Sequence, residues 1–136
     1  MPLLRLEVVT PQRKVLETEA ESIIVPGVDG YIGFQPNHAP IVAGLGIGVL
    51  QYGPAGGKKE LMAVSGGFVE VAGNRVSVLA DAAERPEEID VARAEAARQR
   101  AERRLRERSE NIDRARAEAA LRRALNRLRI AQGTVV

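Results

Sequence analysis

Three arginines in the C-terminal half of the chain have the spacing that best suits chemistry on an anion. Arg123 and Arg127 stand four residues apart, so on a helix they share one face. A chain reversal near residue 110 brings Arg93, 17 residues before it, level with Arg127, 17 residues after it. Guanidiniums grouped in this way repel one another unless an anion joins them, and their planar fork suits phosphate. The alternative is a solvated helix face supported by pairs one turn apart, for example Glu118 with Arg122.

Catalytic and metal chemistry find little support in the rest of the sequence. The chain has one histidine, His38, and no cysteine, which excludes a thiol nucleophile, a thiolate zinc site and a cluster of histidines around a metal. His38 lies in a loop-forming segment, where a bond between its ring and the local backbone is expected. Gly57-Lys58 is followed by Lys59 and not by Ser or Thr, so this segment is not a P-loop. We therefore expect no bound metal and no enzymatic activity.

The composition divides the 136 residues into two parts that must position these arginines. Residues 1–86 hold all 7 prolines and all but one of the 13 glycines, and their 7 Lys+Arg and 9 Asp+Glu give a net charge of −2. Residues 87–136 hold 13 Lys+Arg and 9 Asp+Glu, a net charge of +4. We predict two domains, 1–86 and 87–136, because residues that break helices are confined to the first. No apolar run approaches the roughly 20 residues that span a bilayer.

The first part is predicted to be an antiparallel β-sandwich or flattened barrel. Alternating apolar residues begin the chain at Leu4, Leu6 and Val8, as in a strand with one buried face. Further strands are expected at 22–25, ended by Pro26-Gly27, and at 46–52, 61–64, 67–72 and 75–79, the last two joined by a hairpin turn at 73–74. Short strands with Gly and Pro turns at this spacing are typical of sandwiches.

The second part is predicted to be a two-helix hairpin. Alanines and leucines recur at steps of three and four in two stripes, which are Ala94, Ala97, Ala101 and Leu105, then Ala117, Leu121, Ala124, Leu128 and Ala131. Residues 109–111, Ser-Glu-Asn, favour a break between the helices, Asp90 is a candidate N-cap, and Gly133 is a candidate terminator. Since buried alanine contributes far less than the roughly 1.5–3 kcal/mol of buried leucine, the hairpin holds itself together weakly and is expected to leave its docking site or bind a partner.

Binding of nucleic acid is the main alternative role for this basic hairpin. An adaptor that binds nucleic acid or an acidic protein would use the arginines as a charged surface. A net charge of +4 over about 50 residues, with acids interleaved and no aromatic residue, argues against nucleic acid. An acidic protein partner remains compatible with the sequence.

Several segments in order resemble the epsilon subunit of the F-type ATP synthase. They are VVTP at 8–11, GYIGFQPNHAP at 30–40, AVSGGFVEV at 63–71 and VSVLADAAE at 76–84. The resemblance extends over essentially the whole chain. It implies a non-catalytic rotor subunit of the central stalk, at the cytoplasmic face of the bacterial plasma membrane and in contact with the membrane only indirectly.

The resemblance also implies the partners and a regulatory mechanism. In the family, the β-domain binds the gamma subunit and the loops of the c-ring, and the segment 31–38 resembles the part that faces the c-ring. The hairpin of the family permits ATP hydrolysis when it is folded down, and inhibits hydrolysis when it extends into the alpha/beta catalytic head. A weakly packed hairpin suits such a two-state element.

A nucleotide-binding motif of some bacterial members is present in this chain. Its I/L-D-x-x-R-A pattern is matched by Ile89, Asp90, Arg93 and Ala94. The supporting acid of the family corresponds to Glu84, and its two arginines on the second helix correspond to Arg123 and Arg127. The resemblance therefore implies that the folded-down hairpin binds ATP through these seven residues as a regulatory ligand.

Overall fold

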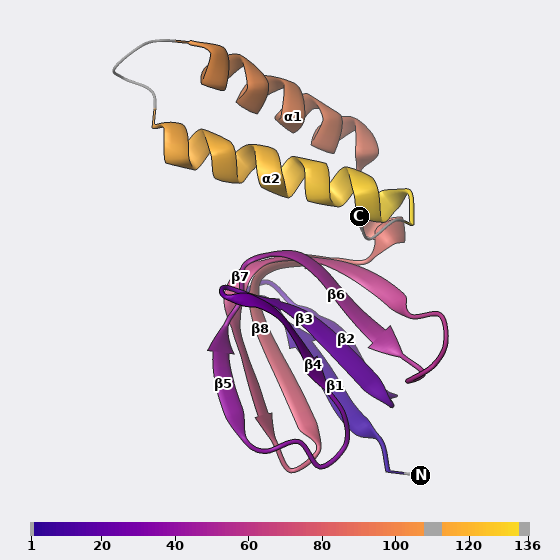
Figure 1. The fold of residues 1–136 in the computed structure, drawn as a ribbon. Coiled ribbons are helices and arrows are strands. Elements are labelled where there is room, and N and C mark those ends of the chain that lie inside the picture. The colour runs from indigo at the N-terminus through magenta and orange to yellow at the C-terminus, as the bar shows by residue number, and fades with distance from the viewer. Residues whose placement is uncertain (1, 108–112, 134–136) are drawn as a thin grey trace.

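The computed structural model describes residues 2–107 and 113–133. Eight strands form the first part, and they are β1 (Leu4–Val9), β2 (Lys14–Ala20), β3 (Ser22–Gly27), β4 (Gly30–Phe34), β5 (Ile41–Gly44), β6 (Ile47–Gly53), β7 (Glu60–Ala72) and β8 (Arg75–Glu84). A short 3-10 helix, η1 (Pro86–Glu88), leads to α1 (Val91–Arg106) and α2 (Arg114–Ala131). The sandwich followed by a helical hairpin confirms the predicted fold class (Figure 1).

The strands form one sheet in the order β2-β1-β8-β7-β6-β3-β4, with β5 paired to β7 beside β6. All pairs are antiparallel except β1 with β8, which join the first and last strands in parallel. The apolar side chains of both layers meet in one core, and Leu4, Leu6 and Val8 are completely buried there, as their alternation predicts.

The segment 60–72 is a single strand, and the prediction of two separate strands there was wrong. The first half of β7 pairs with β6 and the second half pairs with β5, and the change occurs at Gly66-Gly67. Both glycines have positive φ, 72° and 104°, which other residues rarely adopt. A bend in one continuous strand therefore lets β7 serve two partners on the same side.

Pro26-Gly27 does not end β3, contrary to the prediction, because β3 continues through both residues in its pairing with β4. Pro26 has no N–H, and the pairing of β3 with β6 stops at Ile24. The edge of β6 beyond that point is left open to other partners. The second helix of the C-terminal part, α2, docks against this open edge.

The helical hairpin lies over one end of the sandwich, with α2 between α1 and the sheet (Figure 1). Asp90 caps α1 by accepting a hydrogen bond from the Arg93 amide at 3.0 Å, as predicted. The predicted break at 109–111 lies outside the described residues, and the cap of α2 is Asp113, which accepts from the Arg116 amide at 3.1 Å. Gly133, with φ of 80°, follows the end of α2.

Alanine dominates the buried face of the hairpin. The fully buried residues of the two helices are Ala94, Ala101, Ala117, Ala124 and Ile130. Ile130 is the one large side chain among them, and it packs with Ile89, Val49 and Ala63 in a small second core between hairpin and sheet. The hairpin is thus held to the sandwich by few large apolar contacts.

Candidate functional site

A cavity of about 350 Å³ opens where the end of β8, the linker η1 and the two helices meet. Five of the residues singled out by the sequence line it, and they are Glu84, Asp90, Arg93, Ala94 and Arg127. They come from the end of β8, the N-cap and first turn of α1, and the last third of α2. The structure therefore brings Arg93 and Arg127 to the same level, as expected for a hairpin that reverses near residue 110.

Glu84 and Arg127 form an ion pair inside this cavity. The Nε of Arg127 donates to Oε1 of Glu84 at 2.5 Å, and both side chains are about two-thirds buried. Partial burial strengthens such a pair relative to an exposed one. The pair fixes Arg127 at its Nε, and its terminal nitrogens remain available to donate to a ligand.

Two predicted residues lie beside the cavity rather than in its lining. Arg123 lines a much smaller space, about 10 Å³, which it shares with Glu84, Arg127 and Ser65. Ile89 is buried in the second core against Ile130. Arg123 is therefore one helical turn from the cavity, and Ile89 holds the start of α1 in place.

Three lining residues were missed in the sequence, and they are Glu88, Ala97 and Arg100. The signal for two of them was present, because Arg93, Ala97 and Arg100 follow one another at steps of four and three and share a face of α1. Glu88 carried no such signal, since its position depends on residues far away in the sequence.

Glu88 ties the linker to the sandwich. Its carboxylate accepts from the amide of Arg85 at 2.9 Å and from Nη2 of Arg13 at 2.6 Å. Desolvation is the largest single effect and raises the pKa of Glu88, but the bonds from Arg85 and Arg13 outweigh it, so the pKa is lowered. Arg85 also donates to the Val15 carbonyl at 2.7 Å. Through Glu88 and Arg85, the segment that lines the cavity at η1 is thus bonded to β2 and to the turn before it.

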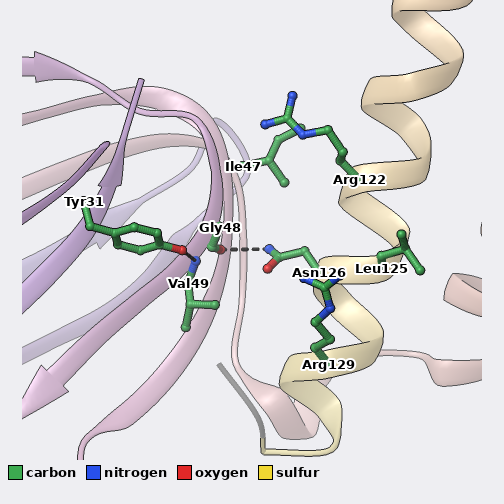
Figure 2. Close-up of a pocket in the computed structure, with 8 residues that line it drawn as sticks. All are labelled: Tyr31, Ile47, Gly48, Val49, Arg122, Leu125, Asn126 and Arg129. Atoms are coloured by element: carbon green, nitrogen blue, oxygen red, sulfur yellow. Dashed lines mark hydrogen bonds between the residues drawn. The ribbon is translucent and has the colours of Figure 1, made fainter. Parts of the chain in front are cut away.

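A second contact region lies between α2 and the open edge of β6, and we call it the seam (Figure 2). Nδ2 of Asn126 donates to the carbonyl of Gly48 at 2.8 Å. The Val49 N–H donates to the hydroxyl of Tyr31 at 3.1 Å. These bonds occupy the backbone groups of β6 that Pro26 and its neighbours leave unpaired.

The segment 31–38 does not form one continuous surface. Tyr31 lies at the seam, close to α2. Asn37 lies beside the turn between β7 and β8, where its amide donates to Oδ1 of Asn74 at 2.6 Å. His38 Nδ1 lies 2.7 Å from its neighbouring carbonyl at Ala39, which agrees with the predicted local role.

The arrangement at the cavity suits binding rather than bond-breaking. Arg93, Arg100 and Arg127 bring guanidinium donors to the cavity, and Glu88 and Asp90 bring carboxylate acceptors. Within residues 2–107 and 113–133, no group of acids and histidine is placed to hold a metal ion. Across the same ranges, no helix is long and apolar enough to cross a bilayer.

Two protein-family models match the chain, one in each part. A model described as ATP synthase, Delta/Epsilon chain, beta-sandwich domain matches residues 3–86. A second, described as ATP synthase, Delta/Epsilon chain, long alpha-helix domain, matches residues 87–132. The chain belongs to the ATP synthase delta/epsilon family.

Relatives of this delta/epsilon chain are named ATP synthase epsilon chain. That of Pelotomaculum thermopropionicum is 55% identical over 101 residues, 74% of this chain and 75% of the relative. That of Symbiobacterium thermophilum is 58% identical over 103 residues, 75% and 73% of the two chains.

Solved structures of mitochondrial ATP synthases contain similar chains. One, from the Euglena gracilis complex of OSCP, F1 and c-ring, has a TM-score of 0.75 and 26% identity, and the match covers 90% of this chain and 78% of that one. Another, from the central stalk and c-ring of Tetrahymena thermophila, has a TM-score of 0.55 and 14% identity over 98% and 96% of the chains, and shares the fold.

Proposed function

We propose that the chain is a non-catalytic rotor subunit that links a gamma subunit to the c-ring and regulates ATP hydrolysis. Membership of the delta/epsilon family supports this role, as does the similar chain in the Euglena gracilis structure of OSCP, F1 and the c-ring. We place the subunit at the cytoplasmic face of the bacterial plasma membrane, as a peripheral part of the synthase. The extended hairpin would contact the alpha/beta head.

We further propose that the docked hairpin binds ATP as a regulatory ligand. The observation that carries this proposal is the cavity in which Glu84, Asp90, Arg93, Ala94 and Arg127 meet. Its guanidiniums suit the phosphates, and the carboxylate oxygens of Asp90 and Glu84 not engaged with Arg93 and Arg127 suit donors of the ribose and base. Arg123, one helical turn from Arg127, would also contact the bound ATP.

Regulation would follow from a shift in population. The cavity is built from both the sandwich and the hairpin, so ATP would bind only while the hairpin is docked. Occupancy then stabilises the docked state by an amount that grows with ATP concentration. Because few large apolar side chains hold the hairpin, we expect that increment to change which state dominates.

Calorimetric titration of the full chain with ATP tests the nucleotide site. We expect saturable one-to-one binding, and an affinity reduced at least about a hundredfold by Arg123→Ala with Arg127→Ala, since charge-assisted hydrogen bonds contribute roughly 1.5–3 kcal/mol each. The matched control is Arg103→Ala with Arg104→Ala on the exposed face of α1. AMP serves as the ligand control.

A second variant separates ligand binding from docking. Arg127→Ala also unpairs Glu84 and so perturbs the hairpin itself. Arg93→Gln leaves that ion pair in place and is expected to weaken ATP binding about tenfold. An ATP affinity unchanged in both variants would remove the nucleotide site from the proposal, and the rotor role would stand without it.

A further inference from the structure

The seam contains a small cavity with an unbalanced charge. The cavity has a volume of about 160 Å³, and Arg122 and Arg129 reach it from the same face of α2, seven residues apart. Figure 2 shows Arg122 reaching from α2 toward Ile47, Asn126 directed at Gly48, and Arg129 further along the same helix. No carboxylate lines this cavity in the part of the chain that the structure describes.

The seam cavity differs from the cavity near η1 in whether its arginines are paired with acids. At the cavity near η1, Arg127 is paired with Glu84, and Glu88 and Asp90 also line the space. At the seam, Arg122 and Arg129 form no ion pair with any described acid. Both arginines are solvent-exposed, so water screens much of their mutual repulsion, and an anion held between them would add a charge-assisted attraction that neither has from a described acid.

Tyr31 adds a donor that is set by the fold. Its hydroxyl oxygen already accepts from the Val49 N–H at 3.1 Å, so its own hydrogen is free to donate elsewhere. The position depends on Gly48, because a Cβ there would lie 2.6 Å from the Tyr31 hydroxyl oxygen. Asn126 is held by its bond to the Gly48 carbonyl at 2.8 Å. The polar side chains at the seam are thus fixed by the backbone of β6.

We propose that the seam is a second anion site, separate from the nucleotide cavity, and that its ligand is free inorganic phosphate. The volume of about 160 Å³ has room for a tetrahedral oxyanion, and it is less than half that of the cavity near η1. Two arginines of α2 and Tyr31 of the sheet line this space, and guanidinium groups pair well with the oxygens of phosphate.

Phosphate at the seam would report on the hairpin. Arg122 and Arg129 belong to α2, and Tyr31 belongs to the sandwich, so the full donor set exists only in the docked state. Binding therefore stabilises docking by mass action, independently of the nucleotide cavity. The docked state would then respond to phosphate concentration as a separate input.

Amide NMR of the full labelled chain tests this site directly. Phosphate is titrated into the millimolar range at constant ionic strength, with chloride as the balancing salt, and the Gly48 and Val49 amides are followed. We expect saturable one-to-one shifts that weaken about tenfold or more in Arg122→Gln with Arg129→Gln. The same affinity is expected in Arg103→Gln with Arg104→Gln, which removes equal charge from α1 outside the seam.

A further variant and further ligands test whether the hairpin is docked and which class of anion binds. Tyr31→Phe leaves α2 untouched and is expected to weaken phosphate binding several-fold. The Gly48 and Val49 amides of each variant without phosphate report whether the hairpin is still docked. Equal shifts from acetate and phosphate, shifts from ATP but not from phosphate, or equal phosphate affinity in all variants with a docked hairpin would each overturn the proposal.

Discussion

Glu17 on β2 is the acid whose environment is most altered by its neighbours. Nζ of Lys14 donates to its carboxylate at 2.8 Å, and Arg5 pairs with the same group from β1. The hydrogen bond from Lys14 and then that from Arg5 lower the pKa of Glu17 from 4.5 to about 2. Glu7, directly across on β1, lies 3.8 Å from Lys14 at its carboxylate and shares that cation.

The depressed pKa sets the direction of an acid effect. A carboxylate with a lowered pKa in the folded state contributes stability that is complete above pH 4.5 and is lost as the pH falls toward 2. We expect Glu17→Gln to flatten the dependence of the free energy of unfolding on pH in this window, measured by urea denaturation. Glu19→Gln, two residues along the same strand, is the control, and an equal flattening in both would contradict the assignment.

At the scale of single residues, features of the helical hairpin were predictable from the sequence, whereas contacts between the hairpin and the sandwich were not. The Asp90 cap follows from the preference of Asp for N-cap positions, and the common level of Arg93 and Arg127 follows from a hairpin that reverses near residue 110; the structure agrees with both. That these residues bind ATP stays a prediction. Glu88 was missed because its partner Arg13 is 75 residues away, and no local pattern encodes that pairing.

The bend in β7 at Gly66-Gly67 lets this strand pair with both β5 and β6. Gly67 has a φ of 104°, and a Cβ there would lie 2.0 Å from the carbonyl oxygen of Leu79. We expect Gly67→Ala to lower the free energy of unfolding by about 3 kcal/mol or more, because neither the backbone angle nor the space admits a side chain.

Chemical denaturation monitored by circular dichroism measures this effect. The control is Gly56→Ala, since nothing lies within 4 Å of a Cβ at that turn. We expect the control to change the free energy by less than about 0.5 kcal/mol. A midpoint for Gly67→Ala equal to that of the control would show that the bend is not required.

Strands were predicted well where one face is buried and poorly where a strand changes partners. β1 was evident from its alternation, whereas β3 was cut short before Pro26, β7 was divided at Ser65-Gly66, and β2, β4 and β5 were not predicted. Proline and glycine usually end strands, but here Pro26 and Gly66 each sit where one neighbouring pairing stops and another continues. The sequence alone does not reveal such a second partner.

At the scale of the whole molecule, Ile130 is the main apolar link between hairpin and sandwich. It is completely buried and packs against Val49, Ala63 and Ile89. We expect Ile130→Ala to weaken docking by about 2–4 kcal/mol, since truncation of a buried isoleucine removes its packing and leaves a cavity.

Native-state hydrogen exchange distinguishes docking from global stability. In Ile130→Ala, the amides of α1 and α2 should exchange roughly 30-fold faster or more, while those of β7 and β8 keep their protection. Leu6→Ala, equally buried in the main core, should instead lower protection across the sandwich. Equal loss of protection in helices and strands of the Ile130 variant would mean that the two parts unfold as one unit.

The contacts that dock α2 are concentrated near one end of it. Asn126, Arg127 and Ile130 touch the sandwich, whereas Arg114 at the start of the helix lies far along the axis (Figure 1). Sixteen residues at 1.5 Å each place Arg114 about 24 Å from Ile130. The hairpin is therefore a lever arm, and a tilt of about 10° at its fulcrum would sweep the start of α2 through about 4 Å. Small forces applied far from the sandwich would thus act on the docking contacts with mechanical advantage.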